Sequence, residues 1–173
     1  MEKHKTCSFF GHRNINANND LKQKVKNCIE ELIINYNVQT FLFGSKSNFN
    51  DLCHLAVSEL KEKYPNIKRV FYTCKSEGCT LEIEREKYEI IYSRLLNQKI
   101  RLLGFEEEFE HKSKYEAGRA SYVERNQAMI NDSDFCIFYY NKNYVPSTKT
   151  NSGTKLAYEY AVRRKKKIIN LFE

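Results

Sequence analysis

Three turns rich in small residues each combine groups that bind phosphate. Gly11-His12-Arg13 and Gly44-Ser45-Lys46-Ser47 each follow an apolar run, and Ser152-Gly153-Thr154 opens a segment with helical spacing. Glycine lets the backbone approach a ligand closely, a helix start offers N–H groups with partial positive charge, and arginine can hold phosphate through two hydrogen bonds. These residues predict a phosphate-binding site, although Ser and Thr also cap ordinary helices.

Other polar residues could complete such a site or serve the fold instead. Arg13 could clamp a phosphate, or it could tie its loop to Asp51 or Glu159. His12 could hydrogen-bond a ligand or only the loop backbone. Arg125-Asn126 lies on a predicted helix, where it belongs either to a solvated charged face or, if turned inward, to the ligand site.

Short apolar runs alternate with longer amphipathic segments along the whole chain, which predicts a parallel sheet with helices on both faces. We expect one domain over residues 1–173, with a Rossmann-like three-layer α/β/α sandwich and a doubly wound, mainly parallel sheet in the strand order 4-3-2-1-5-6. Ligands bind such sheets beyond the carboxyl ends of the strands, at the switch point between the first and fifth strands. The expected strands are Thr6–Phe10, Thr40–Phe43, Ile67–Tyr72, Ile100–Leu103, Phe135–Tyr140 and Lys167–Phe172. The expected helices are Asp20–Tyr36, Asp51–Lys63 with Asn50 as cap, Leu81–Leu96, Ala117–Ile130 and Thr154–Arg164, and residues 104–116 read as acidic and irregular.

Composition narrows the classes of function. The chain of 173 residues is 41% hydrophobic and 29% charged, which is typical of a globular protein. Its formal charge of +7 favours anionic partners, although the charge could equally serve solubility alone. No apolar run is long enough to span a bilayer, and no signal-peptide pattern is present, so we expect a cytoplasmic protein with reduced cysteines. Cys7, Cys28, Cys53 and Cys136 fall inside apolar patterns. Cys74 and Cys79 could form half of a zinc site, but no second pair completes it, and we expect no metal and no cofactor.

Several motifs together resemble the YpsA-type proteins of the SLOG superfamily. The opening Ser8–Arg13 (SFFGHR), the segment Glu124–Phe135 (ERNQAMINDSDF) and the later Ser152-Gly153-Thr154 carry the resemblance, in order, over nearly the whole chain. Asp51 lies where these proteins often carry an Asp after the second glycine turn. The resemblance implies a nucleotide-binding domain, similar to sensors of nucleotide-derived signals in bacterial and phage conflict systems, and helix-mediated pairing into a homodimer or larger homo-oligomer.

The same superfamily includes LOG-type phosphoribohydrolases, and this chain departs from their catalytic pattern. Arg125 matches their arginine, but Asn126 replaces their lysine and Ala157 occupies the position of their catalytic glutamate. Glycosidic cleavage needs a carboxylate near the anomeric carbon, and Glu159 lies about 200° further around the helix axis. We therefore expect binding rather than catalysis, with Arg125, Glu159 and Asp51 as the candidates if a hydrolase activity is present.

The leading interpretation is a protein that binds a nucleotide or nucleotide-derived small molecule, as a sensor or a sequestering protein. The first alternative is a nucleoside 5′-monophosphate N-glycoside hydrolase, and the second is nucleic-acid binding like that of the DprA-type members of the superfamily. The basic run Arg163–Lys167 suggests that second alternative, but cations also stabilise the end of a helix, so nucleic acid is disfavoured as a partner. Asp51 is expected to take a ribose hydroxyl, and Tyr139, Tyr140 or Tyr144 to stack on the base or pack in the core. The expected ligand-binding residues are Gly11, His12, Arg13, Gly44, Ser45, Asp51, Arg125, Asn126, Ser152, Gly153 and Thr154.

Overall fold

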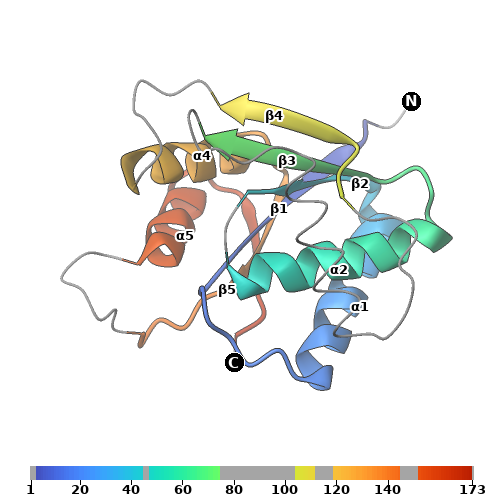
Figure 1. Ribbon diagram of the computed structural model, residues 1–173, viewed down its shortest axis with the longest axis horizontal. Helices are drawn as coiled ribbons and strands as arrows, with labels where there is room; N and C mark the ends of the chain where they lie inside the picture. Colours follow the sequence, from blue (N-terminus) through green and yellow to red (C-terminus); the bar gives the residue numbers. More distant parts are fainter. Residues whose placement is uncertain (1–2, 45–46, 75–103, 112–118, 145–151, 173) are drawn as a thin grey trace.

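The computed structural model describes residues 3–44, 47–74, 104–111, 119–144 and 152–172. Strands and helices alternate along most of these residues (Figure 1). None of the described helices is both long and apolar enough to cross a membrane. The elements are β1 (Lys5–Gly11), α1 (Asn19–Tyr36), β2 (Val38–Phe43), α2 (Asn48–Lys63), β3 (Lys68–Cys74), β4 (Glu107–His111), α4 (Arg119–Asn131), β5 (Phe135–Tyr139), α5 (Gly153–Arg163) and β6 (Lys167–Asn170).

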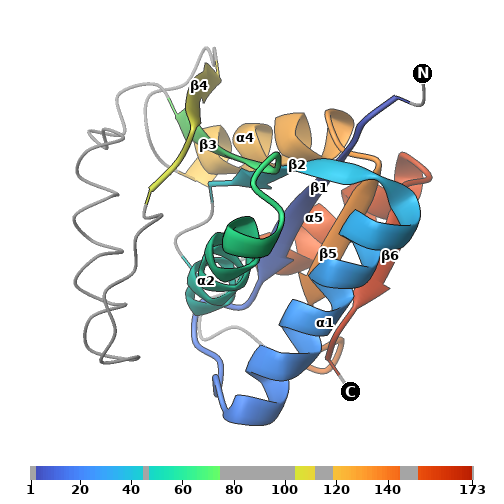
Figure 2. The same cartoon turned by 90° about the vertical axis from the view of Figure 1, so that its right-hand side faces the viewer.

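The six strands form one parallel sheet in the order β4-β3-β2-β1-β5-β6. This result confirms the predicted strand order and the Rossmann-like α/β fold. The winding direction reverses between β1 and β5, so α1 and α2 cover one face of the sheet and α4 and α5 the other (Figures 1 and 2). The carboxyl ends of all six strands therefore lie at one edge of the sheet.

The position of β4 corrects the sequence-based expectation for residues 104–116. Glu107–His111 is a strand rather than an irregular segment, and the strand predicted at 100–103 and the helix predicted at 81–96 lie outside the described residues. β4 lies at the end of the sheet, where a strand needs little apolar character. Phe109 packs its ring 4.8 Å from that of Tyr72, and Lys68 bonds Glu107 at 2.9 Å, so neighbouring side chains of β3 hold the acidic strand.

The start of α2 also differs from the prediction. Ser47, not Asn50, is the N-cap, and its Oγ accepts a hydrogen bond from the Asn50 backbone N–H at 3.0 Å. Asn50 is fully buried instead, and its Oδ1 accepts from the Gly44 N–H at 3.5 Å. The amide of Asn50 therefore links the first turn of α2 to the turn that follows β2.

Apolar side chains fill both faces of the sheet. On the α1 and α2 face, the Phe9 ring stacks with Phe41 and Phe43 at centroid distances of 6.0 and 5.1 Å. On the α4 and α5 face, Phe10 stacks on Phe138 at 5.2 Å. Consecutive residues of β1 thus serve opposite faces, which explains why this buried strand is apolar without interruption.

The described cysteines are all free thiols, and most lie in the core. Burial raises the pKa of Cys28 and of Cys136 to about 11, so neither thiol ionises at neutral pH. Cys74 is buried at the end of β3, and Cys79, its partner in the half zinc site considered above, lies outside the described residues. Within the described ranges, no three His, Cys, Asp or Glu side chains are placed to hold a metal ion. The cysteines expected in the core are free, as predicted: Cys7, Cys28, Cys53 and Cys136.

A side chain extends the hydrogen bonding between β5 and β6 beyond the last paired residues. Asn170 accepts the Tyr140 N–H at its Oδ1 and donates its Nδ2 to the Tyr140 carbonyl, both at 3.0 Å. The same Oδ1 accepts from the Phe172 N–H at 3.3 Å. The end of β5, where the loop toward α5 begins, is thereby fixed to the strand at the edge of the sheet.

Candidate functional site

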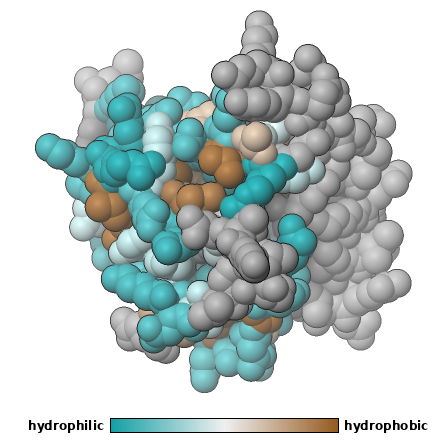
Figure 3. Space-filling model, turned by 90° about the vertical axis from the view of Figure 1, so that its left-hand side faces the viewer, coloured by the Kyte–Doolittle hydropathy of each residue, from teal (hydrophilic) through white to brown (hydrophobic). Residues whose placement is uncertain are grey.

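The carboxyl edge of the sheet brings two of the three predicted turns together and carries the third. In Figure 1 the arrowheads of β3 and β4 point to the left, and Figure 3 looks onto that side of the molecule. The coloured residues there are mostly hydrophilic, with hydrophobic side chains between them. Gly11 ends β1, Gly44 follows β2, and Ser152 precedes α5. Ser45 lies outside the described residues.

The first glycine is required by packing within the protein. A Cβ at Gly11 would lie 2.5 Å from side-chain atoms of Phe49, which is fully buried in the first turn of α2. Arg13 follows two residues later with an exposed side chain, and its carbonyl accepts the Asn48 N–H at 2.9 Å. Its guanidinium makes no ion pair with a carboxylate among the described residues, so the predicted tie to Asp51 or Glu159 is not formed there.

His12 connects β1 to the loop that follows β5. Its backbone N–H donates to the Tyr139 carbonyl at 3.3 Å, and its Nε2 accepts the Asn141 N–H at 2.9 Å. Because Nε2 is the acceptor, the proton of the neutral ring is on Nδ1. Burial lowers the pKa of His12, which favours that neutral form. Of the two roles considered for His12, the structure shows the hydrogen bond to the loop backbone.

The second turn lies against Arg125. A Cβ at Gly44 would lie 2.8 Å from the Tyr72 carbonyl oxygen and 3.1 Å from the Cδ and Nε atoms of Arg125. Arg125 is only 4% exposed, and its guanidinium carbon lies 5.2 Å above the Tyr122 ring. Arg125 therefore faces inward beneath the carboxyl ends of β2 and β3 rather than belonging to a solvated face of α4.

Asp51 and Asn126 are both partly buried at this end of the fold. Asp51 is in the first turn of α2, and Asn126 follows Arg125 on α4. The Asn126 Oδ1 atom is buried and has no hydrogen-bond partner in the part of the chain that the structure describes. A buried amide oxygen without a partner is a candidate for accepting a hydrogen bond from a ligand.

The third turn forms an ordinary helix start that is open to a ligand. The Ser152 Oγ accepts the Lys155 N–H at 3.4 Å, and Thr154 is 8% exposed. Gly153 is exposed, and a Cβ there would meet no atom within 4 Å. The fold therefore does not require glycine at this position, in contrast to Gly11 and Gly44.

The two positions of α5 that bear on catalysis have different surroundings. Ala157, which occupies the place of the LOG-type glutamate, is 4% exposed and packs in the core. Glu159 is exposed on the outside of the helix. The side of α5 that packs on the sheet thus offers a methyl group where those hydrolases carry a carboxylate.

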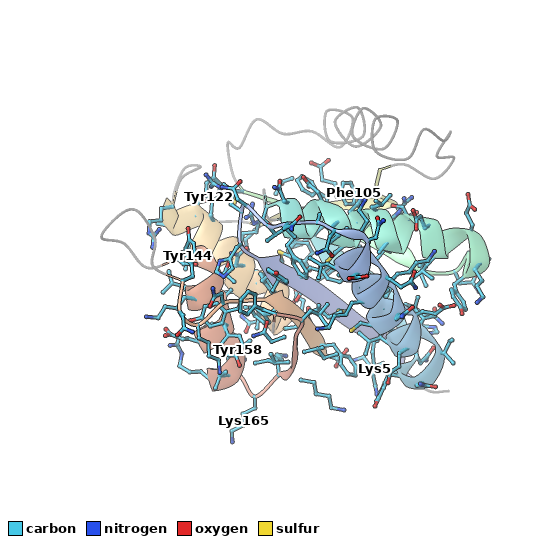
Figure 4. All side chains as sticks on the ribbon, turned by 90° about the horizontal axis from the view of Figure 1, so that it is seen from below. Lys5, Phe105, Tyr122, Tyr144, Tyr158 and Lys165 are labelled. Atoms are coloured by element: carbon cyan, nitrogen blue, oxygen red, sulfur yellow. The ribbon has the colours of Figure 1, made fainter. Side chains whose placement is uncertain are left out.

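The basic run at the end of α5 lies at the other end of the strands. Arg163 holds its guanidinium carbon 5.6 Å above the Tyr160 ring, and Lys166 donates its Nζ to the Asn131 carbonyl at 3.3 Å. Lys167 begins β6, with its Nζ 5.3 Å above the Phe135 ring. Figure 4 shows Lys165 away from Tyr122, which is at the carboxyl edge.

Sequence reasoning missed the side chains that fix these turns in place. Ser47 was named only as part of the second turn, and Asn50 and Tyr122 were not among the predicted site residues, although each touches a turn or the buried arginine. An asparagine inside a strongly apolar helix face was the available signal for Asn50. No local pattern pointed to Tyr122, because its contact depends on which face of α4 turns inward.

Comparison with known proteins gives a fold relationship. No protein-family model matches the sequence, and no curated protein matches it. A solved structure of DNA processing protein A from Helicobacter pylori, described for its single-stranded DNA binding mode, is similar with a TM-score of 0.56 and 14% identity. The match covers 95% of this chain and 63% of that one, so the chain spans less than two thirds of that protein. At this identity the comparison supports the Rossmann-like α/β fold alone, and the SLOG and YpsA-type assignments stay predictions.

Proposed function

We propose that the carboxyl edge of the sheet binds the phosphate group of a nucleotide. The observation that carries this proposal is Arg125, a residue that is only 4% exposed and whose side chain lies against Gly44 at the ends of β2 and β3. A buried cation at the switch-point edge of a parallel sheet is placed where such folds bind anionic ligands. Burial also strengthens its interaction with phosphate, because water screens the charges less.

The neighbouring groups supply the remaining contacts. The exposed Arg13 adds a second cation that can form paired hydrogen bonds to phosphate oxygens. The start of α5 at Ser152, Gly153 and Thr154 adds backbone N–H groups with room for a ligand to approach. Asp51 would accept a hydrogen bond from a ribose hydroxyl, and the Asn126 Oδ1 would accept a further hydrogen bond.

Single-stranded nucleic acid is the second candidate ligand, and the structural comparison favours it over a free nucleotide. The similar protein is described as binding single-stranded DNA, and the formal charge of +7 suits a polyanion. Nucleic acid, which the sequence disfavoured as a partner, is therefore a candidate ligand. Both ligands would place phosphate at the same edge.

We propose binding without glycosidic hydrolysis. Ala157 cannot stabilise an oxocarbenium ion or activate water, and the exposed Glu159 is not packed against the sheet. Pairing into a homodimer or larger assembly remains a proposal drawn from the SLOG resemblance, and a role as sensor or sequestering protein would follow from binding without turnover.

Calorimetry with mono-, di- and cyclic nucleotides, ADP-ribose and a dT10 strand tests the proposed function. At least one of these ligands should bind with micromolar affinity, and Arg13→Gln should weaken it about tenfold, the effect of removing one charge-assisted contact. Arg164→Gln, which removes another exposed arginine at the end of α5, is the matched control and should leave affinity unchanged. The proposal fails if every ligand is silent, or if the two variants behave alike.

A further inference from the structure

Three tyrosines lie at the end of β5 or in the loop that follows it, and among them Tyr144 has the most exposed ring. Tyr140 is 8% exposed, and Tyr139 packs between Phe49 at 5.6 Å and Phe172 at 5.2 Å. Tyr144 is 49% exposed. The structure thus separates the core tyrosines from one that is available on the surface.

The Tyr144 ring is held in place despite its exposure. Its N–H donates to the Asn141 carbonyl at 3.1 Å, and the Asn143 N–H donates to Asn141 Oδ1 at 2.9 Å. The Asn141 N–H in turn donates to His12 Nε2 at 2.9 Å, and the rings of His12 and Tyr144 lie 4.6 Å apart. The two hydrogen bonds to Asn141 shape the turn, and the bond from Asn141 to His12 fixes that turn beside the end of β1. The imidazole of His12 contacts one side of the Tyr144 ring.

The position of this ring relates it to the phosphate site. His12 lies between Gly11 and Arg13 in the chain, so Tyr144 rests on the turn that carries the exposed arginine. In Figure 4 the labelled Tyr144 and Tyr122 lie at the same end of the molecule, and Lys5, at the start of β1, lies at the opposite end. A ligand whose phosphate reaches Arg13 would therefore carry its other end near Tyr144.

We propose that Tyr144 is the stacking platform for an aromatic base and that His12 is the positioning residue behind it. The inference rests on the proposed function and adds the ligand class: a nucleobase-bearing phosphate, free or in a strand, rather than a sugar phosphate or inorganic phosphate. An exposed ring fixed in advance loses little conformational freedom on binding, which favours stacking. Because His12 Nε2 is occupied by Asn141, His12 acts on the ligand through Tyr144.

The test compares ligands with and without a base. AMP, GMP, CMP, UMP and dT10 are each titrated by calorimetry beside ribose 5-phosphate and an abasic ten-residue strand. The wild type should bind its best base-bearing ligand at least tenfold tighter than the matching ligand without a base. Tyr144→Ala should weaken base-bearing ligands by about five- to 150-fold, equivalent to the ~1–3 kcal/mol of one stacked base. Tyr144→Phe should retain the affinity, and ribose 5-phosphate should bind all three proteins equally.

Two further variants separate stacking from a general loss of structure. Tyr36→Ala removes another partly exposed ring, at the start of the strands, and should leave the preference for a base unchanged. His12→Ala should reduce the preference for a base while ribose 5-phosphate binding persists, since only the support of Tyr144 is lost. Circular dichroism confirms that each variant is folded.

The outcomes distinguish this inference from the proposed function. If ligands with and without a base bind the wild type equally, or if Tyr144→Ala keeps the full preference for ligands with a base, Tyr144 does not stack on the base. The proposal that this edge binds phosphate would then still hold. If Tyr144→Ala weakens both classes equally, Tyr144 acts on the fold of the site and the inference is also overturned. If no ligand binds the wild type, the proposed function and the inference fail together.

Discussion

Replacing Glu106 with glutamine should destabilise the protein by about 2–4 kcal/mol, because it removes a carboxylate charge that is paired with a buried arginine. Arg69 is 3% exposed and donates to the Glu106 carboxylate through its backbone N–H at 2.7 Å, its Nε at 3.1 Å and its Nη2 at 2.8 Å. Lys61 adds an ion pair at 3.2 Å. The Glu106 side chain is 26% exposed, so we place the loss somewhat below the 3–5 kcal/mol typical of a broken, fully buried pair.

The neighbouring Glu107→Gln is the matched control for this prediction. The Glu107 and Lys68 side chains are each 55% exposed, and such surface pairs contribute about 0–1 kcal/mol. Urea denaturation gives the unfolding free energy of each variant. The comparison requires that the unfolding free energy falls with urea concentration at the same slope in both variants and the wild type. Losses that agree within about 0.5 kcal/mol would refute the argument that burial of Arg69 makes the first pair important.

The same pair predicts how stability depends on pH. Burial alone would raise the pKa of Glu106, but its hydrogen bonds to Arg69 and the charges of Arg69 and Lys61 outweigh burial and lower the pKa below the ordinary value of 4.5. The carboxylate therefore stabilises the fold fully above the unfolded-state pKa, and this contribution disappears as the pH falls through the lower folded-state pKa. The difference in unfolding free energy between the wild type and Glu106→Gln should therefore become smaller in that acidic range.

Four other expectations follow from the packing and the site. Gly11→Ala should lower the unfolding free energy by about 1–3 kcal/mol, because the new Cβ would meet Phe49. Gly153→Ala should change it by less than about 0.5 kcal/mol, because a Cβ there faces open space. Equal thermal midpoints of the two variants would contradict this difference. Gly153→Val should stay folded yet weaken nucleotide binding in calorimetry, and unchanged affinity would remove this turn from the site. Binding to dT10 should weaken steeply as salt rises, in proportion to the phosphates contacted, and a flat salt dependence would exclude a phosphate-dominated contact. Long incubation with AMP, GMP, CMP or UMP should release no free base by chromatography; release that Glu159→Gln or Asp51→Asn abolishes would establish the hydrolase alternative instead.

The sheet was predictable because buried parallel strands leave a clear pattern. β1, β2, β3, β5 and β6 are short apolar runs bounded by polar turns, and the strand order follows from the winding rules for such folds. β4 was missed because it lies at the end of the sheet and is held by individual contacts of Phe109 and Glu107. Hydrophobic patterns do not report strands of this kind.

The candidate site was predictable in part. The sequence left open whether Arg125 belongs to a solvated face or turns inward, and the structure places its side chain against Gly44. The link from His12 to Asn141 joins residues 129 positions apart and depends on how β1 and β5 pair, so no local pattern could select it over a ligand contact. The need for glycine at position 11 also arises from a distant side chain, that of Phe49.

The amide of Asn170 gives the edge strand a mechanical role in the site. It holds Tyr140 by both its N–H and its carbonyl, and the next residue, Asn141, donates to the imidazole that supports Tyr144. Only a group that donates and accepts at once can make both bonds, so conversion of Asn170 to aspartate by deamidation would set a carboxylate against the Tyr140 carbonyl. Deamidation of Asn170 in β6 would thus weaken the attachment of the end of β5 and, with it, that of the turn that carries Tyr144.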